Sequence, residues 1–253
     1  MIYTCYEMIR DCRADKGEGW SYFVSNYTPI IRKLIAHYGG DFENALALLC
    51  KPESSLFQSL DPAPERWFIA EMRQQIVASL PQAAPEITLD LETVAEALAP
   101  LTLVEKQAAW FETMRFTPRQ TGEALRMAPA TVEKIRARAA ELIRGKVDSW
   151  RRELLSENGH ILGLAAAEVK TKDCLPAKTF LDVLDGRSTW RGREEMDLHA
   201  GKCWRCIDHF CRMAEVVELL RGVQPLTEEE AATLKKKLRI ETPKTSWWRR
   251  RAL

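Results

Sequence analysis

The sequence predicts an all-α protein, and three observations support that fold class. Val, Ile and Thr rarely alternate with polar residues, so the pattern of a half-buried strand is scarce. Apolar residues recur instead at spacings of three and four along most of the 253-residue chain, as in amphipathic helices. Glycine and proline are few and gather at plausible helix boundaries. We therefore expect successive helical blocks joined by short breaks.

The composition is typical of a soluble globular protein, with 46% apolar and 29% charged residues. Lys and Arg (37) nearly balance Asp and Glu (36), so the net charge indicates no partner. No N-terminal signal pattern is present, and the apolar runs fall far short of the roughly 20 residues that span a bilayer. We expect a cytoplasmic protein without stable membrane insertion. There the seven cysteines favour free thiols or metal ligands over disulfides.

Residues 1–80 form the first expected helical domain. Trp20 and Tyr27 belong to an apolar series at helical spacing, and "GGD" at 39–41 supplies one helix end followed by a helix start. "ERWFIAEMRQQIVASL" closes the block as a further helix. The two prolines that follow make residues 81–90 the expected linker.

Residues 91–155 form the second expected domain, and its centre has the pattern of a helix-turn-helix. Thr117 caps a short helix whose first residue is Pro118. "MAPA" makes a tight corner, and Pro129 begins a longer basic helix. Gly122 falls where the first helix must approach its neighbour closely. In a helix-turn-helix the second helix enters the major groove of DNA.

The charge of this segment also favours DNA binding. Residues 115–152 hold ten Lys or Arg and four Asp or Glu, whereas the whole chain is nearly neutral. Each phosphate that a basic side chain neutralises strengthens binding through counterion release. A solvated basic helix in an ordinary bundle is the alternative that periodicity and charge leave open. The candidate DNA-binding residues here are Arg119, Thr131, Lys134, Arg136 and Arg138.

The stretch from "ALAPLTLVEKQ" to "RAAELIR" (97–144) resembles region 4 of the sigma-70 family, specifically the compact extracytoplasmic-function (ECF) sigma factors. Thr117 matches the capping position of that region. Residues 120–122 match its Glu-Ile-Ala-like triplet, although the first two differ in type, and residues 131–132 match the Thr-Val pair. The resemblance implies contact with the −35 promoter element through the helix at 130–143.

Residues 1–80 resemble region 2 of the same factors through the order and length of their helices. The resemblance implies that Trp67 and Phe68 help to melt and read the −10 element, where stacking on an unpaired base is worth roughly 1–3 kcal/mol. The alternative that at least one of these aromatic residues belongs to the core stays open. "DFENALALL" at 41–49 departs from the acidic motif with which these factors contact the polymerase clamp.

A third block, at 165–222, contains the metal-capable stretch "LHAGKCWRCIDHFC". In a continuous helix, where residues advance by about 100° each, His199, Cys203 and Cys206 share one face. Cys211 lies on the other side and His209 at the edge, as a fallback ligand. Because tetrahedral zinc takes four ligands, a fourth must come from another segment.

Cys174 is the candidate fourth ligand. A helix at about 176–185 and a turn at Gly186 make a hairpin that returns it to the ligand face. The spacing, together with "FLDVLDG" at 180–186, resembles the zinc-binding anti-sigma domain. The alternatives are cysteines that act as small buried apolar residues and a catalytic zinc ion. We expect a structural or sensing Zn²⁺ site, because several thiolates make a closed and electron-rich centre.

Together these observations predict a transcription initiation factor rather than an enzyme. The expected partners are promoter DNA, core RNA polymerase and, within the chain, a contact between the zinc domain and the sigma-like regions. A helix-turn-helix regulator that never engages polymerase is the alternative. Residues 223–253 are expected as a tail.

Overall fold

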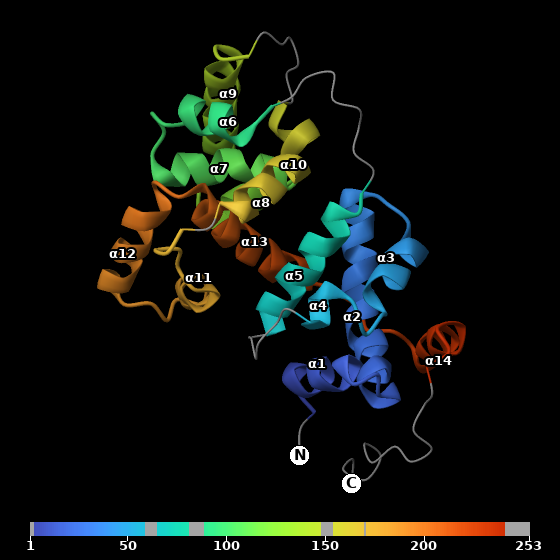
Figure 1. The fold of residues 1–253 in the computed structure, drawn as a ribbon. Coiled ribbons are helices and arrows are strands. Elements are labelled where there is room, and N and C mark those ends of the chain that lie inside the picture. Colours follow the sequence, from blue (N-terminus) through green and yellow to red (C-terminus); the bar gives the residue numbers. More distant parts are fainter. Residues whose placement is uncertain (1–2, 59–64, 81–88, 148–153, 170, 241–253) are drawn as a thin grey trace. The chain divides into compact units, whose positions relative to one another are not determined.

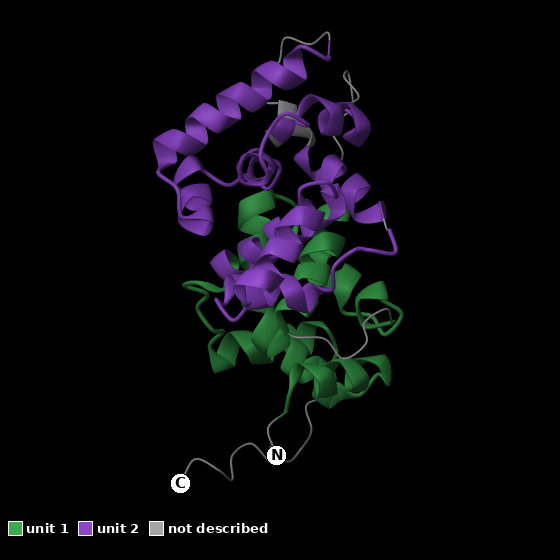
Figure 2. Cartoon of the chain, turned by 90° about the vertical axis from the view of Figure 1, so that its left-hand side faces the viewer, with its two compact units in different colours: residues 1–79, 219–253 green, residues 80–218 purple. Residues whose placement is uncertain are grey.

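The computed structural model describes residues 3–58, 65–80, 89–147, 154–169 and 171–240. These residues form fourteen helices and no strand, so the all-α prediction is confirmed (Figure 1). The chain divides into two compact units, residues 1–79 with 219–253 and residues 80–218, which are green and purple in Figure 2. Among the described helices, none combines the length and the apolar character that crossing a bilayer requires.

An aromatic core holds the first unit together. Trp20, Phe23, Tyr27, Phe57 and Phe68 are buried, and the ring centroids of neighbouring pairs lie 5.0–6.3 Å apart. Such edge-to-face and stacked pairs stabilise the unit by more than the burial of their apolar area alone. The described helices of this unit are α1 (Cys5–Arg13), α2 (Gly17–Tyr38), α3 (Phe42–Leu49), α4 (Ser55–Gln58), α5 (Glu65–Ala78) and α14 (Glu228–Lys237).

The second unit contains the expected helix-turn-helix. Thr117 and Gln120 form a reciprocal capping box at the start of α8. α8 ends at Leu125, and the next residue, Arg126, has left-handed backbone angles. A Cβ on Gly122 would lie 2.5 Å from the Met127 carbonyl oxygen, so glycine permits the tight corner. The helices of the unit are α6 (Leu91–Ala97), α7 (Leu103–Thr113), α8 (Pro118–Leu125), α9 (Pro129–Arg144), α10 (Leu154–Glu168), α11 (Ala177–Leu184), α12 (Trp190–Ala200) and α13 (Trp204–Leu220), whose last two residues fall in the first unit.

Residues 156–164, which separate the second and third expected blocks, do not interrupt the helical structure, because α10 runs through them. Gly159 in this stretch serves close packing instead of a turn. A Cβ on Gly159 would lie 2.2 Å from the carbonyl oxygen of Thr113 on α7. The two helices can approach this closely only because glycine has no side chain.

The expectation of one continuous helix over 198–211 is also wrong. α12 ends at Ala200 and α13 begins at Trp204. Between them the Lys202 N–H donates to the His199 carbonyl at 3.0 Å and the Cys203 N–H to the Ala200 carbonyl at 3.2 Å. These short-range bonds close a tight turn in place of the next α-helical turn.

The region expected as a tail contains α14, which packs against α2 in the first unit. Thr227 and Glu230 form a capping box at its start. The described part of the chain ends at residue 240, and of the expected linker only residues 89–90 are described.

Candidate metal centre and DNA-binding face

Three side chains from one short stretch and a fourth from an earlier segment converge in the second unit. One ligand atom each from Cys174, His199, Cys203 and Cys206 lies within 4.8 Å of the other three. The Cys174 and Cys203 sulfur atoms are 3.9 Å apart. The predicted proximity of these four residues is therefore confirmed, including that of Cys174 from outside the dense stretch.

Three separate segments supply the four residues. Cys174 precedes α11, His199 lies in the last turn of α12, and Cys206 lies in the first turn of α13. Cys203 stands in the turn between α12 and α13, and its carbonyl accepts the Cys206 N–H at 3.0 Å. The turn thus places Cys203 and Cys206 close to His199 at the end of α12.

Thr171 supports the cluster from the segment before Cys174. Its N–H and its hydroxyl each lie 3.4 Å from the Cys174 sulfur. Burial opposes ionisation of this thiol, but hydrogen bonds with Thr171, Cys203 and Cys206 together outweigh it and lower the pKa of Cys174 below its ordinary value. Burial and the neighbouring cysteines raise the pKa of Cys206 to about 12. Close thiols of this kind ionise together when a cation lies between them.

His199 provides an independent test of whether a metal ion fits the cluster. Its Nε2 atom is buried and has no hydrogen-bond partner within the described part of the structure. Buried nitrogen atoms without a partner are rare, and metal coordination is one way to satisfy them. Three thiols and one imidazole are a donor set of structural zinc sites. The residues present therefore fit a tetrahedral, thiolate-rich metal ion.

The fallback ligand His209 and the excluded Cys211 both lie outside the cluster. His209 packs against the Phe180 ring at 5.0 Å between centroids, and burial lowers its pKa to about 2, so it is neutral. Cys211 is fully buried with its sulfur 4.0 Å from the Gln107 carbonyl oxygen. Both are packing residues of α13, as the phase argument indicated for Cys211.

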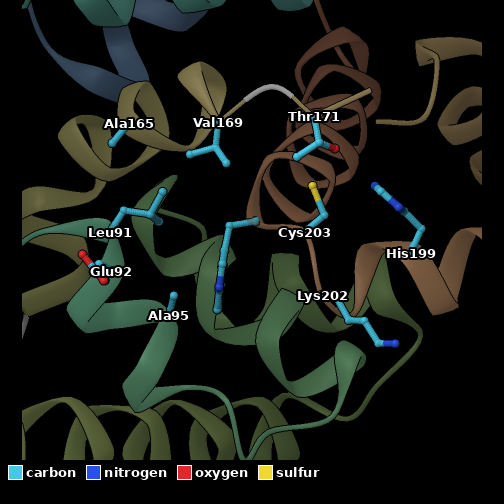
Figure 3. Close-up of a pocket in the computed structure, with 10 residues that line it drawn as sticks. Leu91, Glu92, Ala95, Ala165, Val169, Thr171, His199, Lys202 and Cys203 are labelled. Carbon is cyan, nitrogen blue, oxygen red and sulfur yellow. The ribbon is translucent and has the colours of Figure 1, made fainter. Parts of the chain in front are cut away.

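A cavity of about 560 Å³ lies beside the cluster (Figure 3). Leu91 of α6, Ala165 of α10 and Val169 just after α10 line one part of it with apolar side chains. His199 and Cys203 line another part, so this edge of the cluster faces an apolar space rather than a packed core.

The segment that carries the cluster, residues 171–218 (here the cysteine segment), packs directly on helix α7. The Trp110 indole N–H donates to Asp208 Oδ1 at 3.0 Å, and the Trp110 and Trp204 rings are 5.2 Å apart. Lys106 Nζ donates to the Gly201 carbonyl at 3.0 Å. Asp208 also forms a buried ion pair with Arg212 at 2.7 Å. Since α7 packs against α8 and α9 as well, it joins the cysteine segment to the helix-turn-helix.

Sequence reasoning missed this polar contact on α7. The signal available was an Asp and an Arg four residues apart among the apolar residues of α13, where unpaired charges are costly to bury. A partner for Asp208 was therefore to be expected, but nothing in the sequence pointed to Trp110.

Four of the candidate DNA-binding residues are exposed to solvent. Thr131 and Lys134 are exposed on α9. Arg119 and Arg138 are also exposed, and they pair with Glu123 at 3.0 Å and with Glu105 at 3.2 Å.

Arg136 differs, because its guanidinium donates hydrogen bonds to residues within the second unit. It donates to the Phe116 carbonyl at 2.9 Å and to the Thr121 hydroxyl at 2.8 Å, and burial lowers its pKa. Its role in this structure is to join α9 to α8. Trp67 is half-buried in α5 of the first unit, next to the core residue Phe68.

Comparison with known proteins adds no family to this description, because no family model, curated protein or solved structure matches the chain.

Proposed function

We propose that this chain is a DNA-binding transcription initiation factor of the ECF sigma type, which directs RNA polymerase to promoters. The observation that carries the proposal is the capped helix-turn-helix of α8 and α9 with exposed basic residues on α9. The order of the blocks and the resemblance of 97–144 to sigma region 4 add the link to transcription initiation.

The proposed DNA surface follows from which α9 side chains are exposed. Thr131 and Lys134 lie in the first two turns of α9, the part that contacts base edges in a helix-turn-helix. Arg138 and Arg119 extend the basic surface toward the phosphates. Their carboxylate partners, the half-buried Glu105 and the exposed Glu123, form surface ion pairs that are weak enough for a phosphate to replace. Arg136 is not part of the proposed surface, since its donors are engaged within the module.

The cysteine segment is proposed to bind Zn²⁺ and to regulate the DNA-binding module. Cys174, His199, Cys203 and Cys206 would supply four ligands, which leaves no open position for substrate and favours a structural or sensing role. When bound, zinc would crosslink the segment before α11 to α12 and α13. Through the contact of α13 with α7, the state of the cluster would reach the helix-turn-helix.

The test is run-off transcription with core RNA polymerase and a randomised promoter library, with the full chain as the added factor. Promoter-dependent transcripts are expected from the wild type and are expected to disappear with Lys134→Glu. A co-purification with core polymerase under reducing and oxidising conditions accompanies it. If the chain binds no core polymerase in either state, the sigma proposal is wrong.

The second candidate is a helix-turn-helix regulator that binds DNA without engaging polymerase. The departure of residues 41–49 from the acidic clamp motif favours it. Specific DNA binding by the chain alone, with no binding to core polymerase, would establish this alternative.

A further inference from the structure

The cavity beside the candidate metal centre has the size of a small-molecule site. Its volume of about 560 Å³ falls within the range of roughly 300–1,000 Å³ that such sites occupy. Ala95 on α6 and Ala165 on α10 line it with methyl groups, so two short side chains leave space between these helices and the cysteine segment. Protein interiors fill most such spaces with their own side chains, so a cavity of this size has room for another molecule.

The walls of the cavity favour an aromatic ligand. Leu91 and Val169 add aliphatic surface, and the half-buried Trp204 adds an aromatic ring. A second ring against Trp204 gains more than the burial of its apolar area alone, which an acyl chain does not.

The charged residues that line the cavity lie at its edge. Glu92 and Lys202 are both exposed, and in Figure 3 their charged ends point away from the centre of the cavity. They carry opposite charges, so together they select neither an anion nor a cation. A charged group on the ligand would lose its hydration against the apolar walls, which costs free energy. The cavity therefore favours an uncharged ligand.

A molecule in this cavity would contact two parts of the second unit at once. Ala95 belongs to α6, which packs against α9, and Ala165 belongs to α10, which packs against α7. His199 and Cys203 line the cavity from the cysteine segment. A ligand that binds only while these parts lie together stabilises their contact by mass action.

We propose that the cavity is a binding site for a small, uncharged aromatic molecule of about the size of naphthalene. The ring lies against Trp204 between Ala95 and Ala165, covers the edge of the cluster at His199 and Cys203, and holds the cysteine segment against α6 and α10. This site goes beyond the proposed function, because binding there requires neither DNA nor polymerase.

The test titrates the full chain with phenylnaphthylamine, an uncharged dye that fluoresces in apolar surroundings, and with its sulfonated analogue, which carries a negative charge. Ala95→Trp fills the cavity with a large side chain. Val169→Asp places a charge on a lining position that is 44% exposed, so this second variant keeps its fold even if Ala95→Trp does not. Ala99→Trp is the matched control, because Ala99 is exposed and does not line the cavity. Thermal unfolding checks the fold of every variant.

We expect the wild type and Ala99→Trp to bind the uncharged dye saturably, and Ala95→Trp and Val169→Asp to bind it about tenfold more weakly or worse. The sulfonated dye is expected to bind the wild type about tenfold more weakly than the uncharged dye. Bound dye is also expected to slow hydrogen exchange in α6 and in the turn between α12 and α13.

Three results would overturn the inference. The first is a wild type that does not bind the uncharged dye, and the second is unchanged binding by the folded cavity variants, which would place the dye elsewhere. The third is equal affinity for the two dyes, which would contradict the uncharged class of ligand. None of these results bears on the proposed function, which the transcription and polymerase-binding experiments test separately.

Discussion

At the scale of single residues, the structure separates basic side chains that build the helix-turn-helix from those that face solvent. Arg136 and Lys134 are two positions apart on α9, yet Arg136 donates to α8 and its neighbourhood while Lys134 is exposed. Periodicity placed both off the apolar face. It could not show that the long Arg136 side chain folds back into the module, because that depends on acceptors contributed by Phe116 and Thr121.

We therefore predict different effects for Arg136→Met and Lys134→Met. Losing the Arg136 hydrogen bonds is expected to destabilise the fold by about 1–3 kcal/mol, because the acceptors on Ala108, Phe116 and Thr121 lose their donor. Lys134→Met is expected to leave stability within about 0.5 kcal/mol and to reduce the salt dependence of DNA binding by about one phosphate. Urea unfolding and a salt titration of DNA affinity measure the two effects. Equal stability of the two variants would contradict the assignment of Arg136.

His209 carries a prediction about pH. Burial lowers its pKa to about 2, whereas an unfolded histidine titrates near about 6.5. Below that pH the unfolded state binds a proton that the folded state excludes, so stability falls as pH falls. At pH 5, about 1.5 units lower, the loss is roughly 2 kcal/mol.

His209→Phe should remove this contribution, and the difference between the urea-unfolding profiles of the two proteins from pH 7 to 5 measures it. Both proteins keep the same cysteine cluster, so its own acid sensitivity cancels in the difference. Parallel profiles would show that His209 is not buried in neutral form.

At the scale of helices, close approach explains where the sequence misled. Glycine often interrupts a helix, but Gly159 lies inside α10, where a Cβ would meet the Thr113 backbone. Gly159→Ala is expected to destabilise the protein by about 1–3 kcal/mol, because α7 and α10 must separate. Gly145→Ala is the control, since a Cβ there meets the Leu142 carbonyl oxygen at an ordinary 3.5 Å. Thermal unfolding of both variants decides the point, and equal melting temperatures would contradict it.

The candidate metal centre was predictable in its residues but not in its local structure. Spacing selected Cys174, His199, Cys203 and Cys206, and the structure gathers these four. The reason given for three of them, one face of one helix, fails at the turn between α12 and α13. A tight turn brings the same side chains together, so their proximity was predicted correctly from a helix that the structure does not contain. The position of α14 was not predictable, because its apolar stripe is only two residues wide and its ion-pair partners lie on α2 and α3.

At the scale of the whole chain, the second unit joins the candidate metal centre and the helix-turn-helix through α7. Trp110 on α7 bonds to Asp208 on α13, while other side chains of α7 pack against α8 and α9. Groups that share one packed layer unfold together more readily than separately. Any free energy that a metal ion adds at the cluster is therefore expected to stabilise α9 as well.

We predict that Zn²⁺ raises hydrogen-exchange protection of α9 as well as that of α12 and α13. A metal ion that binds only the folded state slows the exchange of every amide that exchanges through global unfolding of the unit. Cys206→Ser is expected to abolish the zinc effect at both places, and Cys50→Ser, in the first unit and outside the cluster, is expected to leave it intact. Trp110→Phe, which keeps the ring but removes the N–H donor to Asp208, is expected to weaken the effect on α9 more than the effect on α12. If zinc protects the cysteine segment of the wild type but leaves α9 unchanged, the cysteine segment and the helix-turn-helix unfold independently. Regulation of DNA binding by the cluster would then need a route other than α7.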